Sequence, residues 1–242
     1  MLRRLVRGFV DMSRYDPKQA ATFSDKLFLV NAQDQVQRQI SKKEAHLNSY
    51  NYSPEALPHR AFSLFLFNAK NELLLQQRAH KKVTYALYWT NTCCSHQTSA
   101  DNPEASKKDA ITRLNGEVGI DLYRLKSLSN PMQSLTLLSK VIYKDRSDDI
   151  WGEYELDYIY FVKQTDILHK SQIAVNSEEV EALQWLSREQ AQAFVRRTDI
   201  KVTPWFRRIV KQANFCAWWE ALEKGELGRY AEQSEIVHLA DD

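Results

Sequence analysis

A run of chemically reactive side chains extends from Trp89 to His96, in which Cys93 and Cys94 are followed by a serine and a histidine. In an extended chain, side chains two positions apart point to the same side, so Cys94 and His96 are expected to face one cavity. An imidazole can bind a metal or relay a proton, and a thiol with a tuned pKa can donate a proton or act as a nucleophile. In the alternative interpretation, both cysteines are small buried hydrophobic residues.

A pair of carboxylates, Glu153 and Glu155, stands in a segment of alternating polarity, which predicts a strand with both side chains on one face. At about 3.3 Å per residue they would lie roughly 6.6 Å apart along the strand, close enough to bind one cation. Together with His46, His59 and His96 they would form a mixed nitrogen and oxygen donor set, suited to Mn²⁺, Mg²⁺ or Zn²⁺. In the alternative interpretation, the glutamates belong to a solvated strand face.

Several basic residues flank these candidate ligands in the sequence, namely Lys42, Arg78, Lys82 and Arg113. Arginine binds phosphate with a bidentate fork of donors, and lysine binds it as a point charge. The set could therefore hold an anionic substrate, and the alternative is a scatter of solvated charges.

The overall composition narrows the class of protein. A content of 43% hydrophobic and 26% charged residues in 242 is ordinary for a globular protein, and a net charge of +2 does not favour nucleic acid as a partner. No apolar run reaches the roughly 18 residues of a membrane span. Three cysteines, two of them adjacent, do not make a disulfide framework, so we expect a reducing, cytoplasmic setting.

The N-terminal segment Met1 to Arg14 is amphipathic and rich in arginine. This pattern is found in organelle-targeting helices, although Asp11 counts against that interpretation. The alternative is an N-terminal helix that packs on the domain.

The elements that must position these residues alternate between strands and helices. We predict a hairpin from Lys26–Val30 and Gln35–Ile40, an antiparallel pair from Ala61–Phe67 and Glu72–Arg78, and strands over Leu135–Tyr143, Gly152–Val162 and Leu183–Leu186. The polar segment Ser41–Pro58 is expected to be a loop.

Helix signals lie between and after these strands. Asn102-Pro103 marks the start of a helix that ends at Gly119, with Ile111, Leu114 and Val118 on one apolar stripe. Ser187 with Gln190 forms a capping box, and Thr203-Pro204 begins a last main helix that runs toward Gly225. We therefore predict an α/β (α+β) domain over residues 26–242, preceded by an N-terminal extension of residues 1–25 and ending in C-terminal additions.

Four separated blocks of the sequence resemble type I isopentenyl-diphosphate isomerase in their order and spacing: LPHRAFSLFLFNAKNELLLQQR, YWTNTCCSH, YKDRSDDIWGEYELDYI and VTPWFRRIV. The similarity covers roughly His46 to Trp219. It implies the Nudix fold, a mixed β-sheet sandwiched between helices. It also implies an activity in isoprenoid biosynthesis, the conversion of isopentenyl diphosphate to dimethylallyl diphosphate, by a monomer that takes a prenyl diphosphate as its small-molecule substrate.

The resemblance also implies roles for individual residues. Cys94, rather than Cys93, matches the catalytic thiol, and Glu155 matches the second acid/base group. Tyr143 matches a hydrogen-bonding tyrosine of the active site, and Trp205 matches an indole that faces the hydrocarbon end of the substrate. The metal ligands of the family match His46, His59, His96, Glu153 and Glu155. The diphosphate contacts match Lys42, Arg78, Lys82 and Arg113, and Glu117 matches a carboxylate that helps to hold a second ion, Mg²⁺, with the diphosphate.

The implied chemistry begins with protonation of an unactivated alkene to a tertiary carbocation, followed by loss of a proton from the neighbouring carbon. Two acid/base groups on opposite faces, Cys94 and Glu155, could do this. The indole of Trp205 would stabilise the cation through its quadrupole, and a dry pocket would keep water away from it.

The sequence departs from the family pattern at a few positions. Gln97 stands where proline is usual, and Ala86-Leu87 stands where Pro-Gly is usual. Thr112, Arg113 and Gly116 replace the acidic signature of Nudix hydrolases, which argues against a pyrophosphohydrolase. A catalytically silent relative that binds prenyl diphosphates or a protein partner is the other alternative.

Overall fold

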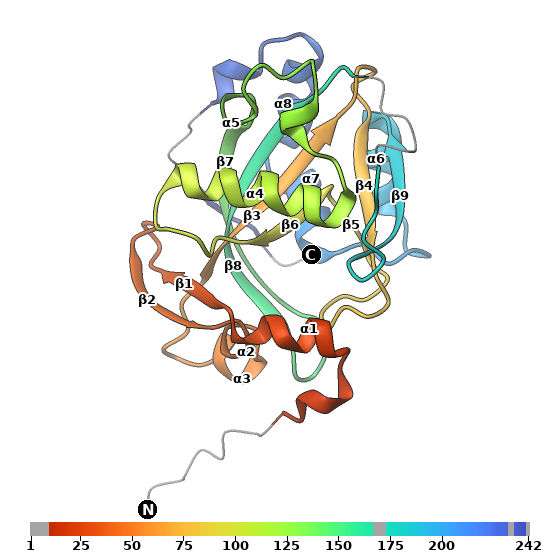
Figure 1. The fold of residues 1–242 in the computed structure, drawn as a ribbon. Helices are drawn as coiled ribbons and strands as arrows, with labels where there is room; N and C mark the ends of the chain where they lie inside the picture. The colour runs from red at the N-terminus through yellow and green to blue at the C-terminus, as the bar shows by residue number, and fades with distance from the viewer. Residues whose placement is uncertain (1–9, 167–172, 232–234, 241–242) are drawn as a thin grey trace, which may run out of the picture.

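The computed structural model describes residues 10–166, 173–231 and 235–240, and its centre is one mixed β-sheet (Figure 1). The strands are β1 Lys26–Val30, β2 Val36–Ser41, β3 His59–Phe67, β4 Leu73–Arg78, β5 Trp89–Thr90, β6 Cys93–His96, β7 Thr136–Arg146, β8 Gly152–Lys163, β9 Val180–Leu186 and β10 Ile236–His238. Their order along the main path is β10-β7-β8-β3-β1-β2. In addition, β4 and β6 pair with β3, and β5 and β9 pair with β4.

The helices are short apart from one. They are α1 Pro17–Ala21, α2 Lys42–Ala45, α3 Asn48–Asn51, α4 Pro103–Val118, α5 Pro131–Ser134, α6 Arg188–Arg196, α7 Pro204–Gln212 and α8 Phe215–Glu223. The 3-10 turns are η1 Met12–Arg14, η2 Thr22–Ser24, η3 Leu122–Arg124 and η5 Leu227–Tyr230. Within the described ranges, none of the helices has the length and apolar character needed to cross a membrane.

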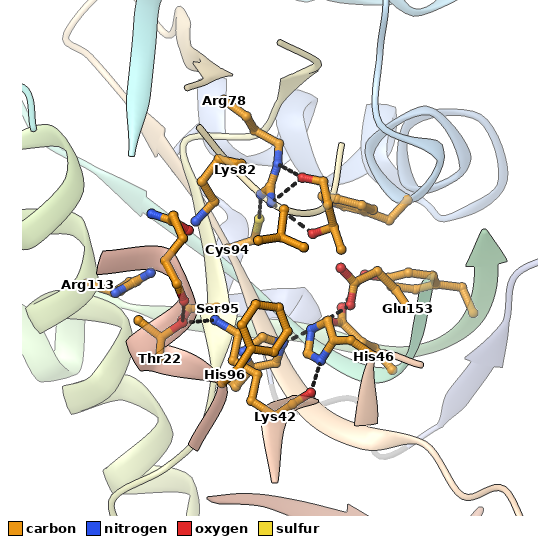
Figure 2. Close-up of a pocket in the computed structure, with 17 residues that line it drawn as sticks. Thr22, Lys42, His46, Arg78, Lys82, Cys94, Ser95, His96, Arg113 and Glu153 are labelled. Carbon is orange, nitrogen blue, oxygen red and sulfur yellow. Dashed lines mark hydrogen bonds and ion pairs between the residues drawn. The ribbon is translucent and has the colours of Figure 1, made fainter. Parts of the chain in front are cut away.

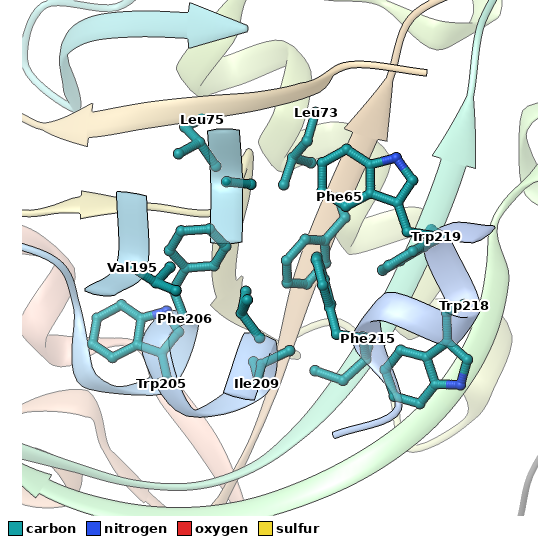
Figure 3. Close-up of a cluster of buried hydrophobic side chains, with 14 of the residues drawn as sticks. Phe65, Leu73, Leu75, Val195, Trp205, Phe206, Ile209, Phe215, Trp218 and Trp219 are labelled. Carbon is teal, nitrogen blue, oxygen red and sulfur yellow. The ribbon is translucent and has the colours of Figure 1, made fainter. Parts of the chain in front are cut away.

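Strand β3 is buried along its whole length because helices cover both faces of the sheet there. Phe65 and Phe67 pack into the core built with α7 and α8, where Phe65 lies 5.1 Å from Phe215 between ring centroids (Figure 3). Leu64 and Leu66 point the other way, into the core beneath α4. A strand that is buried on both faces needs this near-continuous apolar sequence. The predicted sandwich of a mixed sheet between helices is confirmed.

The register of β3 brings the candidate ligands to one end of the sheet. β3 runs parallel to β8 without a shift from His59 opposite Glu155 to Phe67 opposite Lys163. On the other edge of β3, the antiparallel strand β6 sets His96 opposite Ala61. His59, His96 and Glu155 therefore meet at the start of β3, although they are far apart in the sequence.

The predicted helix over 102–119 is confirmed in detail. The Asn102 side chain accepts a hydrogen bond from the Ala105 amide at 2.7 Å, and Gly119 ends α4 in the left-handed region with φ 76°. Ile111 and Leu114 lie in the core on the predicted stripe.

Three predicted elements were wrong in extent or pairing. The expected loop Ser41–Pro58 contains α2 and α3, because the Ser41 hydroxyl caps α2 by accepting a hydrogen bond from the Glu44 amide at 3.2 Å. The expected antiparallel partner of β3, β4, pairs with it only at Phe67 opposite Leu73 and then diverges to pair with β9 and β5. The last main helix is broken into α7 and α8, because Ala213 adopts an extended conformation (ψ 168°). This break lets Phe215 and the indoles of α8 turn into the core.

The predicted N-terminal helix over Met1–Arg14 lies mostly outside the described residues, and its described end, Met12–Arg14, is a 3-10 turn. The hairpin of β1 and β2 and the capping box of Ser187 with Gln190 are confirmed.

Substitution of Gly119 by alanine tests how the end of α4 packs against the rest of the fold. A Cβ at this position would come within 2.4 Å of the Ala174 carbonyl oxygen, whereas a Cβ at Gly225, which also has positive φ (72°), would meet no atom within 4 Å. We expect Gly225→Ala to lower the free energy of unfolding by about 1–2 kcal/mol through backbone strain alone. Gly119→Ala should cost about 2–5 kcal/mol, because a steric clash adds to the strain. Urea unfolding measures both, and equal losses would contradict the packing of residues 173–176 on α4.

Candidate active site

A cavity that opens to solvent lies at the start of β3 (Figure 2). Its walls come from the N-terminal segment, from α2, from β4 and the loop after it, and from α4, α7, β6, β7 and β8. The lining residues include His46, Arg78, Lys82, Cys94, His96, Arg113, Tyr143, Glu153, Glu155, Trp205 and Lys42. Most of the residues singled out from the sequence thus reach one cavity.

The three histidines and two glutamates form one cluster, with a donor atom from each residue within 4.8 Å of every other. The Nε2 atom of His46 lies 3.0 Å from Glu153 Oε2, and those of His59 and His96 each lie 3.2 Å from Glu155 Oε1. All three imidazole centroids are 4.9 Å apart. The parallel register of β3 and β8 produces this convergence, which the sequence could suggest but not establish.

The protonation states of the cluster suit a cation. Burial and the neighbouring His59 and His46 lower the pKa of His96 well below its usual range, so its imidazole is neutral and can act as a ligand. Burial alone would raise the pKa of Glu153, yet His46 outweighs it and the carboxyl has a lowered pKa. The Nδ1 atom of His46 is 2.7 Å from the Lys42 carbonyl oxygen, which fixes the ring and leaves Nε2 for the cluster. The cluster is compatible with a divalent metal ion.

Cys94 and Cys93 lie on opposite sides of β6. Cys93 is fully buried in the core beneath α4, whereas Cys94 lines the cavity. Burial raises the pKa of the Cys94 thiol to about 12, although Arg78 opposes this shift, so the sulfur carries a proton at neutral pH. Arg78 Nη1 approaches the Cys94 sulfur at 3.9 Å. This thiol is therefore a weak nucleophile and a possible proton donor.

Glu155 shares its carboxylate between the histidines and a tyrosine. Its Oε2 atom accepts a short hydrogen bond from the Tyr143 hydroxyl. Burial would raise the pKa of Glu155, but His59 and Tyr143 stabilise the ionised form and the pKa is lowered. The Tyr143 ring stacks on Trp205 with centroids 6.0 Å apart, and Tyr85 meets the same indole edge-on at 5.0 Å. An aromatic wall thus borders the acid/base candidates.

The four basic residues, Lys42, Arg78, Lys82 and Arg113, also line the cavity. In Figure 2, Lys82 and Arg113 lie on one side, and His46 and Glu153 lie on the opposite side. Burial, together with Lys82 and Arg113, lowers the pKa of Lys42 to about 8. The alternative interpretation, a scatter of solvated charges, does not hold for this set, because its members border one cavity.

The loop after β4 holds Arg78 in place. The Nε and Nη2 atoms of Arg78 donate hydrogen bonds to the Thr84 carbonyl oxygen at 3.2 and 3.0 Å. Leu87 in this loop has φ 64°, a left-handed conformation that favours glycine, in agreement with the glycine usual at this position. Gln97 is fully buried and donates to the Asn102 carbonyl oxygen at 2.8 Å, so it fixes the loop after β6 in place of a proline.

Glu117 lies at the C-terminal part of α4, 2.8 Å from Arg113 Nε, and accepts a hydrogen bond from Gln76 at 3.1 Å. It is not among the described residues that line the cavity, and its side chain is buried. Its carboxylate is therefore adjacent to the site rather than exposed in it.

Sequence reasoning missed the contribution of the N-terminal extension. Gln19, Thr22 and Phe23 all line the cavity. The Thr22 hydroxyl accepts a hydrogen bond from Lys42 at 3.3 Å, and the Phe23 ring lies edge-on to His46 at 6.3 Å. No local pattern marks these residues, since a short polar helix gives no sign of where it docks.

Comparison with known proteins agrees with this geometry. The NUDIX domain family matches residues 57–206. A crystal structure of a Deinococcus radiodurans protein superposes with a TM-score of 0.53 at 14% identity, covering 78% of this chain and 98% of that one, which supports the fold alone.

Relatives at higher identity define the family more narrowly. The chain is 40% identical to isopentenyl-diphosphate Delta-isomerase II, chloroplastic, of Arabidopsis thaliana, over 90% of this chain and 76% of that protein. It is 37% identical to isopentenyl-diphosphate Delta-isomerase I of Camptotheca acuminata, over 90% of this chain and 92% of that protein. With the NUDIX match and this identity over most of its length, the chain belongs to the isopentenyl-diphosphate Delta-isomerases.

Proposed function

We propose that Cys94 and Glu155 are the acid/base pair with which this isopentenyl-diphosphate Delta-isomerase converts isopentenyl diphosphate to dimethylallyl diphosphate. The observation that carries this proposal is that both residues line one cavity together with the Trp205 indole. They approach it from β6 and β8, the two strands that flank β3. Such a cavity offers two proton-transfer groups and an aromatic surface, without a strong nucleophile to trap a cation.

The protonation states support a direction for the reaction. Cys94 carries a proton and Glu155 does not, so the thiol is suited to protonate the terminal carbon of the alkene. The resulting tertiary cation would lie near Trp205, whose π face stabilises positive charge. Glu155, with Tyr143 hydrogen-bonded to it, would accept the proton from the neighbouring carbon. In the reverse reaction each group would take the opposite role.

The basic residues are proposed to bind the diphosphate. Lys42, Arg78 and Lys82 would meet its oxygens as charge-assisted donors, with Arg113 beside them. A divalent ion in the His/Glu cluster, Mn²⁺, Mg²⁺ or Zn²⁺, would supply fixed positive charge beside Glu155, and His46, His59, His96 and Glu153 would be its other ligands. Glu117 is proposed to help hold a Mg²⁺ ion that accompanies the diphosphate.

Other expectations remain predictions. These are a cytoplasmic location, a monomeric state, and a division into residues 1–25 and a domain over 26–242. The position of Gln19, Thr22 and Phe23 at the cavity supports an extension that takes part in the site.

Substitution of each cysteine in turn by alanine tests the acid/base assignment. Cys94→Ala is expected to lower isomerase activity by at least about a hundredfold, since a general acid typically contributes 10²–10⁴ in rate. Cys93→Ala is the matched control, because Cys93 lies on the other side of β6 and should affect stability more than chemistry. NMR of the product formed from isopentenyl diphosphate and Mg²⁺ measures both rates. Equal loss of activity in two folded variants would refute the assignment to Cys94.

The metal proposal predicts one tightly bound divalent ion per chain. His59→Ala should weaken its binding by more than the roughly 10–100-fold that loss of an outer-shell partner costs, because a direct ligand close to both Glu153 and Glu155 is lost. His80→Ala is a suitable control, since His80 is exposed and pairs with Glu181 at 2.9 Å outside the cluster. Elemental analysis after dialysis gives the occupancy, and full occupancy in folded His59→Ala would contradict the site.

The reaction in D₂O distinguishes an isomerase from a hydrolase. In D₂O the product is expected to carry deuterium at carbon, because Cys94 and Glu155 exchange protons with solvent between turnovers. Phosphate should not be released at a comparable rate, since the proposed chemistry leaves the diphosphate intact. Release of phosphate without deuterium at carbon would identify a hydrolase instead. Neither signal in a folded, metal-loaded protein would favour a catalytically silent relative.

A further inference from the structure

Two of the proposed diphosphate-binding cations, Lys82 and Arg113, border the same side of the cavity (Figure 2). Like charges that are held close together repel each other, and burial makes the repulsion stronger. A counter-charge must therefore keep these side chains at the cavity wall before a substrate arrives. Glu179, just before β9, supplies it for Lys82, and it shares Arg113 with Glu117, which lies 2.8 Å from Arg113 Nε.

The Glu179 carboxylate binds three groups. Its Oε2 atom accepts a hydrogen bond from Lys82 Nζ at 2.5 Å and lies 3.5 Å from Arg113 Nη2. Its Oε1 atom accepts a hydrogen bond from the Gln19 amide at 3.2 Å. The side chain is only 12% exposed. Glu179 thus links a lysine after β4, an arginine of α4 and a glutamine of α1.

The main chain around Glu179 is also fixed. The Glu179 amide donates to the Asn176 carbonyl oxygen at 2.9 Å, and the Asn176 amide donates to the Glu117 carbonyl oxygen at 2.9 Å. Burial would raise the pKa of Glu179, but Lys82 and Arg113 outweigh it and lower the pKa to about 2. The carboxylate is therefore ionised at neutral pH and tied to the end of α4.

Glu179 stands behind the cations and away from the substrate. Lys82, Arg113 and Gln19 line the cavity, and Glu179 is not among the described residues that do so. A diphosphate can therefore approach the two cations from the cavity while Glu179 keeps its contacts. This arrangement distinguishes a carboxylate that orients the cations from one that competes with the substrate for them.

We propose that Glu179 is a positioning residue that holds Lys82 and Arg113 together at the cavity wall so that both bind the substrate diphosphate. The inference rests on the proposed function, because it requires these cations to bind a diphosphate. The diphosphate is remote from the carbons that react, so its contacts are equally strong in the ground state and the transition state. Loss of Glu179 should therefore raise KM and leave kcat nearly unchanged.

The neighbouring glutamate offers a matched control. Glu178 also pairs with a lysine, Lys81, at 2.8 Å, but Lys81 is outside the set of described residues that line the cavity. Gln19 contacts only the backbone carbonyl of Glu178, so a change of the Glu178 side chain preserves that bond. Glu178→Gln and Glu179→Gln thus remove the same charge from adjacent positions.

The experiment is calorimetric titration of the metal-loaded protein with inorganic pyrophosphate and Mg²⁺, which needs no turnover. Glu179→Gln is expected to weaken binding about tenfold, because two charge-assisted contacts lose their anion. Glu178→Gln should stay within about twofold of the wild type. In the isomerase assay, Glu179→Gln should raise KM by a similar factor while kcat changes by less than about twofold. Unchanged or tighter pyrophosphate binding by folded Glu179→Gln would overturn the proposal.

A second variant shows whether Glu179 acts through the cations. In a Lys82→Met background, the further loss from Glu179→Gln should be clearly smaller than the loss in the wild type, because one of its two partners is already gone. Equal losses in both backgrounds would also overturn the proposal. If Glu179→Gln unfolds, Glu179→Asp keeps the charge one methylene further back and should weaken binding to a smaller extent. A wild type that isomerises normally but does not bind pyrophosphate would refute the positioning role and leave the activity standing, whereas pyrophosphate binding without isomerisation would refute the activity alone.

Discussion

The parallel pairing of β3 with β8 is the constraint on which the rest of the structure depends. It sets His59 opposite Glu155, and β6 on the other edge of β3 adds His96. Two buried carboxylates would be costly alone, and three adjacent imidazoles would be costly if all were protonated. Placed together they compensate one another, with ionised glutamates and a neutral His96. The site is thus an electrostatic unit that depends on this register, since a slip of β8 by one residue would turn Glu153 and Glu155 to the other face of the sheet.

Two cores fix that register. Phe62, Leu64 and Leu66 of β3 pack under α4, and Phe65 and Phe67 pack against α7 and α8, so helices hold the strand from both faces. The same alternation continues through β6, where Cys93 belongs to one core and Cys94 faces the cavity. The difference between an inert thiol and a candidate acid is therefore the side of the strand on which each lies. Residue type alone does not distinguish the inert thiol of Cys93 from the candidate acid Cys94.

Sequence patterns predicted the elements well where one local rule dominates, as in α4 with its cap at Asn102 and its end at Gly119. They failed where the tertiary environment decides, as in the divergence of β4 from β3 and the break between α7 and α8. The five cluster residues were identified from their types and from resemblance to a family. Their convergence depends on strand pairing, which local spacing does not encode. Gln19 and Glu179 gave no signal, because their partners lie far along the chain.

The wall formed by Gln19, Thr22 and Phe23 has a consequence for the order in which the protein matures. During synthesis these residues leave the ribosome well before Trp205, yet they close a cavity that also needs the Trp205 side chain. Contacts of such long sequence separation form late, because the entropy of closing a large loop must be overcome first. The contacts of Gln19, Thr22 and Phe23 at the cavity therefore form only when nearly the whole domain has been synthesised. Catalytic competence would then appear abruptly at the end of folding, and a chain stalled before α7 would present an open, unfinished pocket.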